Sequence, residues 1–240
     1  MKVVVVSGAA RGLGLAISKL LVRQGYLVIG IGRTLTEDYA QLIEQNKSNC
    51  FFYEFDLGNI DQLSKLIKDI TKTHGRLYGL INNAAIGHDG VLSTMHESQI
   101  SELINVNVTS PIVLTKYASR SMLLNGEGRI INVGSIIGST GFNGLSVYGA
   151  TKSSLAGFTK SLSRELGKGG VTVNTLAPGY MKTNMTAGLE GEKLQSIIRR
   201  SPLGELASVE DAAAMVEFLL SDNARSMTGA TFTVDAGSTA

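Results

Sequence analysis

The opening stretch of the chain reads Lys2-Val-Val-Val-Val-Ser-Gly-Ala-Ala-Arg-Gly-Leu-Gly14. The run of valines is typical of a strand that is buried on both faces of a parallel sheet. After it, apolar residues recur at helical spacing as far as Leu21, and Gly25 ends the helix. A strand, a glycine-rich turn and a helix in this order predict a dinucleotide-binding α/β fold.

The three glycines of this turn have separate expected roles. Gly8 permits the tight turn, Gly12 lets the backbone approach phosphates, and Gly14 lets the helix pack closely on the strand. The pyrophosphate would then lie at the helix N-terminus, where free N–H groups and the helix dipole favour an anion. The spacing is G-x-x-x-G-x-G, and a purely structural tight turn is the alternative interpretation.

Length and composition exclude several classes of protein. The chain has 240 residues, of which 43% are hydrophobic and 18% charged, so we expect a single domain with a sizeable core. A net charge of +2 without a Lys/Arg run argues against a nucleic-acid or membrane surface. A single cysteine, Cys50, predicts a buried reduced thiol in a cytoplasmic protein. The three histidines have no metal-ligand spacing, so no metal is expected.

Strand and helix patterns alternate along the rest of the chain. Helices are expected after a capping box at Asn59–Gln62, from Glu97 to Leu124 with an interruption at Pro111, from Val147 onward, and over Ser208–Leu220 with Ser208 as its cap. Strands are expected at Lys2–Val6, Tyr26–Ile31, Cys50–Phe55, Tyr78–Ile81, Arg129–Gly134, Val171–Ala177 and Thr231–Val234. This alternation predicts a doubly wound Rossmann fold, with a mobile substrate lid at about 183–200.

The residues after the second strand bear on which dinucleotide binds. Arg33 stands where an NAD site usually has a carboxylate, and Arg11 could reach the same corner. Two guanidinium groups suit a 2′-phosphate, so NADP(H) is favoured and NAD(H) is the other candidate. Two solvated arginines, with Glu37 and Asp38 nearby, are the alternative. The expected cofactor-binding residues are Gly8, Arg11, Gly12, Leu13, Gly14, Arg33, Asp56, Leu57, Asn83, Ala84, Tyr148, Lys152, Pro178, Gly179 and Thr183.

Tyr148 and Lys152 are the candidate chemical groups. They are four residues apart, so a helix places them on one face, where the ammonium charge should lower the pKa of the phenol. Ser135 closes the preceding strand and could bring a second hydroxyl. Pro111 cannot donate to the carbonyl of Asn107, and we expect that carbonyl to hold a water molecule.

Taken together, these motifs resemble the short-chain dehydrogenase/reductase family over nearly the whole chain. Ser7-Gly8-x-x-x-Gly12-x-Gly14 is similar to its TGxxxGxG motif, Asn82-Asn83-Ala84-Ala85 to NNAG, and Pro178-Gly179 to its PG motif. Asn107, Ser135, Tyr148 and Lys152 match its catalytic tetrad. The resemblance implies a seven-stranded parallel sheet with helices on both faces, and a homotetramer or homodimer.

The resemblance also implies a mechanism. Ser135 positions a substrate carbonyl, Tyr148 donates its proton to the carbonyl oxygen as nicotinamide delivers hydride, and Lys152 holds the nicotinamide ribose. A water on the Asn107 carbonyl would relay protons to Lys152.

The choice of substrate stays open in the sequence. The Gly128–Ser135 run and the Met227–Gly237 ending most resemble bacterial 3-oxoacyl-carrier-protein reductases. That subfamily has basic residues before the fifth and sixth strands, where an acyl carrier protein docks, and this chain has only Lys168 close by. The alternatives are NADP(H)-dependent reduction of a free ketone, sugar or secondary alcohol, and a dinucleotide sensor without turnover.

Overall fold

One parallel sheet organises the protein. The computed structural model describes residues 1–181 and 191–240, and within them seven parallel strands pair in the order β3-β2-β1-β4-β5-β6-β7. The strands are β1 Val3–Ser7, β2 Leu27–Gly32, β3 Cys50–Glu54, β4 Leu77–Asn82, β5 Gly128–Val133, β6 Val171–Pro178 and β7 Thr231–Val234. Each lies within one residue of the bounds that the sequence predicts. The predicted doubly wound, seven-stranded fold is therefore confirmed.

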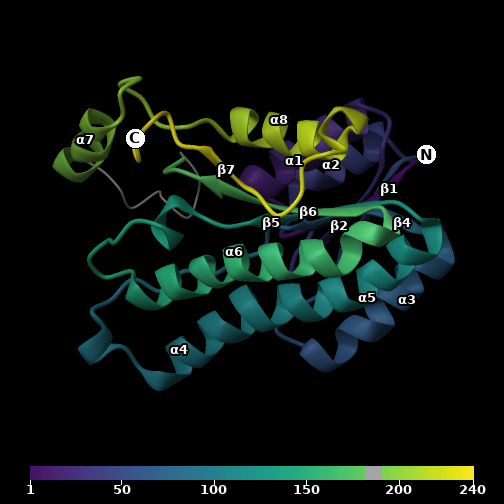
Figure 1. The fold of residues 1–240 in the computed structure, drawn as a ribbon, viewed down its shortest axis with the longest axis horizontal. Helices are drawn as coiled ribbons and strands as arrows, with labels where there is room; N and C mark the ends of the chain where they lie inside the picture. The colour runs from purple at the N-terminus through teal and green to yellow at the C-terminus, as the bar shows by residue number, and fades with distance from the viewer. Residues whose placement is uncertain (182–190) are drawn as a thin grey trace.

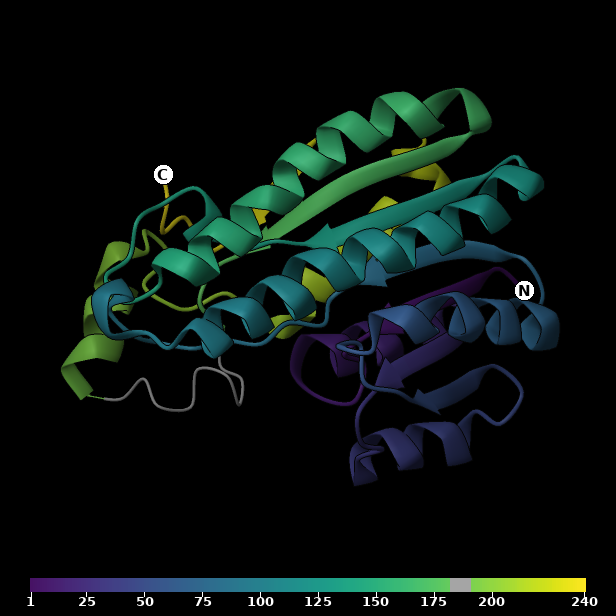
Figure 2. The ribbon, with the colours of Figure 1, turned by 90° about the horizontal axis from the view of Figure 1, so that it is seen from below.

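Helices cover both faces of the sheet (Figures 1 and 2). One layer contains α1 (Gly12–Arg23), α2 (Glu37–Gln45) and α8 (Val209–Leu220). The other contains α3 (Leu63–His74), α5 (Ser110–Asn125) and α6 (Ser146–Leu166). The remaining helices, α4 (Glu97–Ile104) and α7 (Gly191–Arg200), lie toward the end of the molecule that carries the C-terminus (Figure 1).

The valine run of β1 supplies both cores. Val4 and Val6 belong to the core under α1 and α8, whereas Val3 and Val5 belong to the core under α3 and α5. Successive side chains of a strand point to opposite faces, so an unbroken apolar run is what a central strand between two helical layers requires. All four valines are buried.

Three local features differ from what the sequence predicts. The sequence analysis missed α2, which Thr36 caps by accepting a hydrogen bond from the Tyr39 N–H. Asn59 makes no capping hydrogen bond; a short 3-10 turn, Ile60–Gln62, leads into α3 instead. The long helix breaks before Pro111, at a π-helical turn over Asn105–Thr109. Pro111 lies in the first turn of α5, where a missing N–H costs little.

Other expectations hold. Ser208 caps α8 by accepting from the Asp211 N–H at 2.9 Å, and Cys50 is a buried free thiol. No helix in the described ranges has both the length and the apolar character needed to cross a bilayer.

A buried chain of hydrogen bonds crosses the sheet below its carboxyl edge. The Asn82 amide donates to Thr115 and to Asn132, each at 2.8 Å. The Asn132 amide in turn donates to the Thr159 hydroxyl at 2.8 Å, and that hydroxyl lies 2.8 Å from the Thr175 hydroxyl. These five side chains join β4, β5 and β6 to α5 and α6. The chain of bonds fixes the rotation of α6 against the sheet.

Replacing Thr159 by valine should lower stability, because it leaves the buried Asn132 amide and Thr175 hydroxyl without their shared partner. We expect a loss of about 1–3 kcal/mol in the free energy of unfolding. Urea denaturation measures it as a lower midpoint at an unchanged slope. The control is Thr231→Val on the exposed edge of β7, expected to change stability by less than about 0.5 kcal/mol. Equal urea midpoints for the two variants would show that the buried hydrogen bonds of Thr159 do not stabilise the fold.

Candidate active site

A cleft of about 1300 Å³ opens at the carboxyl ends of the strands. In open α/β sheets ligands bind at this edge. The loops after β1, β2, β3, β4, β5 and β6 contribute to its walls, as do α6 and α7. The lining includes the predicted site residues Gly8, Arg11, Gly12, Leu13, Gly14, Arg33, Asp56, Leu57, Asn83, Ala84, Ser135, Tyr148, Lys152, Pro178 and Gly179.

Two predicted site residues are placed differently. Thr183 lies outside the described residues, as does the first part of the predicted lid, whereas its last part forms α7. Asn107 is buried behind the cleft wall rather than lining it.

The glycine-rich loop has the geometry that the sequence predicts. Gly8 and Gly12 have φ angles of 65° and 53°, which side-chain-bearing residues rarely adopt. A Cβ at Gly14 would collide with the Gly8 carbonyl oxygen, so α1 approaches the loop as closely as it does only because Gly14 has no side chain. The loop is tied to β2, since the Gly8 N–H donates to the Ile31 carbonyl at 2.8 Å.

Ser7 and Asn83 join the ends of β1 and β4. The Ser7 hydroxyl donates to the Ile81 carbonyl at 3.2 Å and accepts from the N–H groups of Asn83 and Ala84 at 3.0 Å. The Asn83 amide donates to the carbonyls of Ser7 and Gly8 at 2.9 and 3.1 Å. The Asn83 side chain thus ties the two strand ends together, and Ser7 contributes to the same junction where the family motif has threonine.

The N-terminus of α1 faces the cleft without a cap. Arg11 occupies the N-cap position, makes no capping hydrogen bond with its side chain, and no acidic residue follows in the first turn. Other helices of the protein, such as α2 and α8, are capped by their own side chains. Free N–H groups at a helix start attract an anion, so this end of the cleft fits a phosphate group.

Charge at the β2 end of the cleft favours a further phosphate. Arg11, Arg33 and Thr34 line it, with both arginines exposed and free to reach a ligand. Glu37 and Asp38 lie in the first turn of α2 and are not among the described residues that line the cleft. Asp56 lines the cleft and also accepts from the Gly58 N–H at 2.9 Å, so it stabilises a turn as well.

Lys152 is the central charged group of the site. It lies one turn after Tyr148 on α6, as predicted, and its ammonium donates to the Val133 carbonyl at 2.8 Å. Only 4% of its surface is exposed. Burial disfavours the charged form and lowers the pKa of Lys152 to about 8.

The effect of Lys152 on Tyr148 differs from the expectation. The ammonium lies 5.8 Å from the centre of the Tyr148 ring, but burial dominates and raises the pKa of Tyr148 to about 12. A hydrogen bond with Ser135 lowers it in part, and the negative charge of Asp89 raises it further. The prediction that Lys152 lowers the pKa of Tyr148 is therefore wrong for the protein without ligand. Tyr148 is a protonated phenol throughout the neutral range.

Ser135 is held at the end of β5. Its hydroxyl oxygen accepts from the Ile137 N–H at 3.2 Å and caps a short 3-10 turn, Ile136–Gly138. This contact uses the oxygen as an acceptor and leaves the hydroxyl proton able to point toward the cleft and Tyr148.

Asn107 acts through its side chain on the backbone. Its amide oxygen accepts from the Ile86 N–H and its amide nitrogen donates to the Ile86 carbonyl, both at 2.9 Å. A second donation reaches the Thr151 hydroxyl at 3.3 Å. Asn107 thus connects the π-helical turn to the loop after β4 and to α6. The water on its carbonyl stays a prediction.

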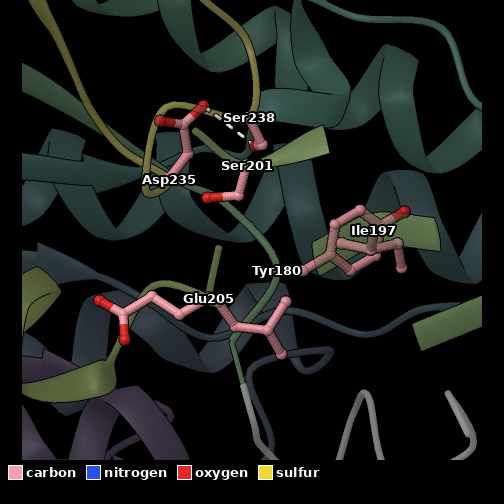
Figure 3. A pocket seen from close by; sticks show the side chains of 7 residues that line it. Tyr180, Ile197, Ser201, Glu205, Asp235 and Ser238 are labelled. Atoms are coloured by element: carbon pink, nitrogen blue, oxygen red, sulfur yellow. Dashed lines mark hydrogen bonds between the residues drawn. The ribbon is translucent and has the colours of Figure 1, made fainter. Parts of the chain in front are cut away.

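A narrow pocket lies beside the cleft (Figure 3). Tyr180, Ile197, Ser201, Asp235 and Ser238 are among its lining residues, and it is too narrow to admit a water molecule. The Ser201 hydroxyl donates to the Ala236 carbonyl at 2.5 Å, which ties the end of α7 to the C-terminal segment. In this structure the pocket is closed by packing between α7 and the C-terminal segment.

The sequence analysis missed several cleft residues. Asp89, Phe142, Tyr180 and Arg200 all line the substrate end of the cleft. Tyr180 had a signal in the sequence, because it follows the Pro178-Gly179 turn at a strand end, and Arg200 falls at the end of the predicted lid. No group of three His, Cys, Asp or Glu side chains in the described part of the chain could hold a metal ion.

Comparisons with known proteins show which proteins this chain resembles. Residues 8–239 match the family model described as enoyl-(acyl carrier protein) reductase. The 3-oxoacyl-(acyl-carrier-protein) reductase FabG of Vibrio cholerae is 39% identical, over 98% of this chain and 96% of that protein. FabG of Escherichia coli is 35% identical, also over 98% and 96%.

Among solved structures, a short chain dehydrogenase from Burkholderia cenocepacia in complex with NADP superposes with a TM-score of 0.93 at 30% identity. The superposition covers 100% of this chain and 98% of that one. The family-model match, the identity to these relatives and the superposition show that the chain belongs to the short-chain dehydrogenase/reductase family.

Proposed function

We propose that the protein is an NADPH-dependent reductase that converts a 3-oxoacyl thioester to the 3-hydroxyacyl form. The observation that best supports this proposal is that Ser135, Tyr148 and Lys152 line one cleft. Arg11 and Arg33 line the same cleft. Two hydroxyl donors beside a buried ammonium suit protonation of a carbonyl oxygen. The FabG relatives, which are named for this reaction, support the choice of substrate.

The residues present fit NADPH. The uncapped start of α1 and the backbone around Gly12 suit the pyrophosphate, and Arg11 and Arg33 suit the 2′-phosphate. Asp56, Leu57, Asn83 and Ala84 would line the adenosine and ribose region, and Lys152, Pro178, Gly179 and Thr183 the nicotinamide end. The bound nicotinamide supplies a hydride to the carbonyl carbon.

The side chains supply the proton. Ser135 donates a hydrogen bond to the carbonyl oxygen and orients it. Tyr148 transfers its phenolic proton to that oxygen as the carbon–oxygen π bond breaks, and the phenolate left behind is stabilised by the Lys152 ammonium. A water on the Asn107 carbonyl would return a proton through Lys152. With a pKa of about 12, Tyr148 is in the acid form that this direction requires.

The acyl carrier is either a carrier protein or coenzyme A. Before β5 and β6, the surface near Lys168 includes Glu127 and the exposed Leu123 and Leu124. Besides Lys168, Arg76 reaches this surface and donates to the Leu124 carbonyl at 2.7 Å, so both thioesters belong in the assay. Reduction of a free ketone, sugar or secondary alcohol is the second candidate, and a sensor without turnover is the third.

Exposed apolar side chains and the single thiol bear on the assembly and location of the protein. We infer a homodimer or homotetramer that covers the exposed Ile104 and Ile112 of α4 and α5, which are 47% and 37% exposed. The buried reduced thiol of Cys50 supports a cytoplasmic location.

Nicotinamide absorbance with the purified enzyme tests the proposal directly. We expect NADPH oxidation with acetoacetyl-coenzyme A or acetoacetyl-carrier protein and little with free ketones. Tyr148→Phe removes the donated proton and should lower kcat by about 100-fold or more, with NADPH binding retained. Turnover of free ketones alone would favour the second candidate. Tight NADPH binding without any turnover would favour the sensor.

The rate of reduction should fall as the pH rises through about 8. Lys152 is charged below its pKa of about 8 and neutral above it, whereas Tyr148 keeps its proton up to about 12. We therefore expect kcat/KM to be flat at neutral pH and to decline by up to about tenfold per unit above 8.

Lys152→Arg is the control, because a guanidinium stays charged over this range and its residual activity should not decline. Circular dichroism and NADPH binding check that the variant is folded. A flat profile to pH 10 in the wild type would contradict the role of Lys152.

Arg33→Ala should weaken NADPH binding by about 10- to 100-fold and leave NADH binding nearly unchanged, because only NADPH carries the 2′-phosphate. Fluorescence titration of each nucleotide measures both constants. Arg23→Ala, in the last turn of α1 and away from the cleft, is the matched control. An equal loss of affinity for NADPH and NADH would show that Arg33 does not bind the 2′-phosphate.

A further inference from the structure

The Tyr180 hydroxyl is a buried polar atom without a partner. It has no accessible surface and no hydrogen bond to any described residue. Buried hydroxyl groups are nearly always hydrogen-bonded, and leaving one unpaired destabilises the protein. The side chain lines both the cleft and the narrow pocket beside it (Figure 3). An unpaired donor on the wall of an active-site cleft points to a ligand that supplies the missing acceptor.

The backbone on both sides of Tyr180 is fixed. The Gly179 N–H donates to the Val234 carbonyl at 2.9 Å, and Met181 forms a parallel bridge with Ala207. A Cβ at Gly179 would lie 2.7 Å from Asp235, so this turn packs tightly on the segment after β7. The ring itself packs against Phe142, with 5.8 Å between ring centres. These contacts fix the backbone of Tyr180 and leave its side chain to adjust toward a ligand.

Tyr180 also lies in the same electrostatic environment as the reacting groups. Burial raises the pKa of both Tyr148 and Tyr180, and the charge of Asp89 raises it further in each. Arg200, at the end of α7, acts on Tyr180 in the opposite direction. All four side chains line the one cleft. The Tyr180 phenol therefore stays protonated, which keeps it a donor, and it lines the same cleft as Tyr148.

We propose that Tyr180 is a specificity-determining residue whose hydroxyl donates a hydrogen bond to a second carbonyl oxygen of the substrate. This inference rests on the proposed function, because a 3-oxoacyl thioester has two carbonyls. The 3-oxo group would meet Ser135 and Tyr148, and the thioester oxygen would meet Tyr180. Substrates without an acceptor at the second position leave the Tyr180 hydroxyl unpaired, so Tyr180 does not favour their binding.

Helix α7 packs beside Tyr180, so the proposed hydrogen bond from the Tyr180 hydroxyl forms only when substrate binds. Ile197 of α7 lines the same narrow pocket as Tyr180, and that pocket admits no water. A substrate oxygen can reach the hydroxyl only when Ile197 and the Tyr180 ring move slightly apart. The Tyr180 hydroxyl then has a partner that it lacks in the free protein. Only ligands that bring a hydrogen-bond acceptor therefore gain binding free energy from this contact.

Two matched substrates and one variant test the inference. The thioester is acetoacetyl-N-acetylcysteamine, and its partner is the corresponding 3-oxobutyl thioether, in which a methylene replaces the thioester carbonyl. Tyr180→Phe removes only the hydroxyl. We expect the variant to lower kcat/KM for the thioester by about tenfold and to leave the value for the thioether unchanged. If the thioether is not reduced, its inhibition constant against the thioester is compared instead and should be equal in both proteins.

The matched control is Tyr26→Phe, which lies beside Tyr78 at the opposite edge of the sheet and should alter neither substrate. The thermal midpoint of Tyr180→Phe should be no lower than that of the wild type, since no internal hydrogen bond is lost. A lower midpoint, or an equal change for both substrates, would overturn the inference. Wild-type enzyme that fails to reduce the thioester at all would instead contradict the proposed function.

Discussion

The hydrogen bond from the Lys152 ammonium to the Val133 carbonyl is the contact on which the site depends. It places a cation inside the protein, where burial strongly disfavours charge. The fold does not neutralise this charge with a carboxylate partner; among the described residues Lys152 forms no ion pair. The pKa of Lys152 consequently falls to about 8. A paired lysine would stay charged at all physiological pH values and could not take part in proton return.

Holding an unpaired cation in place requires a rigid frame. The buried chain through Asn132, Thr159 and Thr175 fixes α6 two turns below Lys152. On the other side, Asn107 connects α6 to the loop after β4 through Thr151 and Ile86. These contacts use side-chain hydrogen bonds in the interior, where their geometry is strict and their loss is costly. Precision at Lys152 thus comes from polar packing below the site as much as from the site itself.

Most of the cofactor side of the cleft could be predicted from the sequence because it is built from local features. Gly8, Gly12 and Gly14 determine the loop through their own φ angles and through close contacts within one strand-turn-helix unit. Tyr148 and Lys152 share a face because a helix has a fixed period. Helix α2 was missed because its nine residues are largely polar and bury only Tyr39 and Leu42. The π-helical turn before Pro111 was missed because proline is compatible with both a kink and a helix start.

The substrate side was not predictable because its residues meet only in three dimensions. Asp89 follows β4, Phe142 follows β5, Tyr180 follows β6 and Arg200 ends α7. No periodicity or spacing connects four such positions; Asp89, Phe142 and Tyr180 are ordinary loop residues, and Arg200 lies within the predicted lid. The chemistry of a carbonyl reductase is therefore readable from short motifs, whereas the identity of its carbonyl depends on long-range packing. The unpaired Tyr180 hydroxyl is where that packing departs from the rule that buried donors find acceptors, and such departures are expected where a ligand completes the structure.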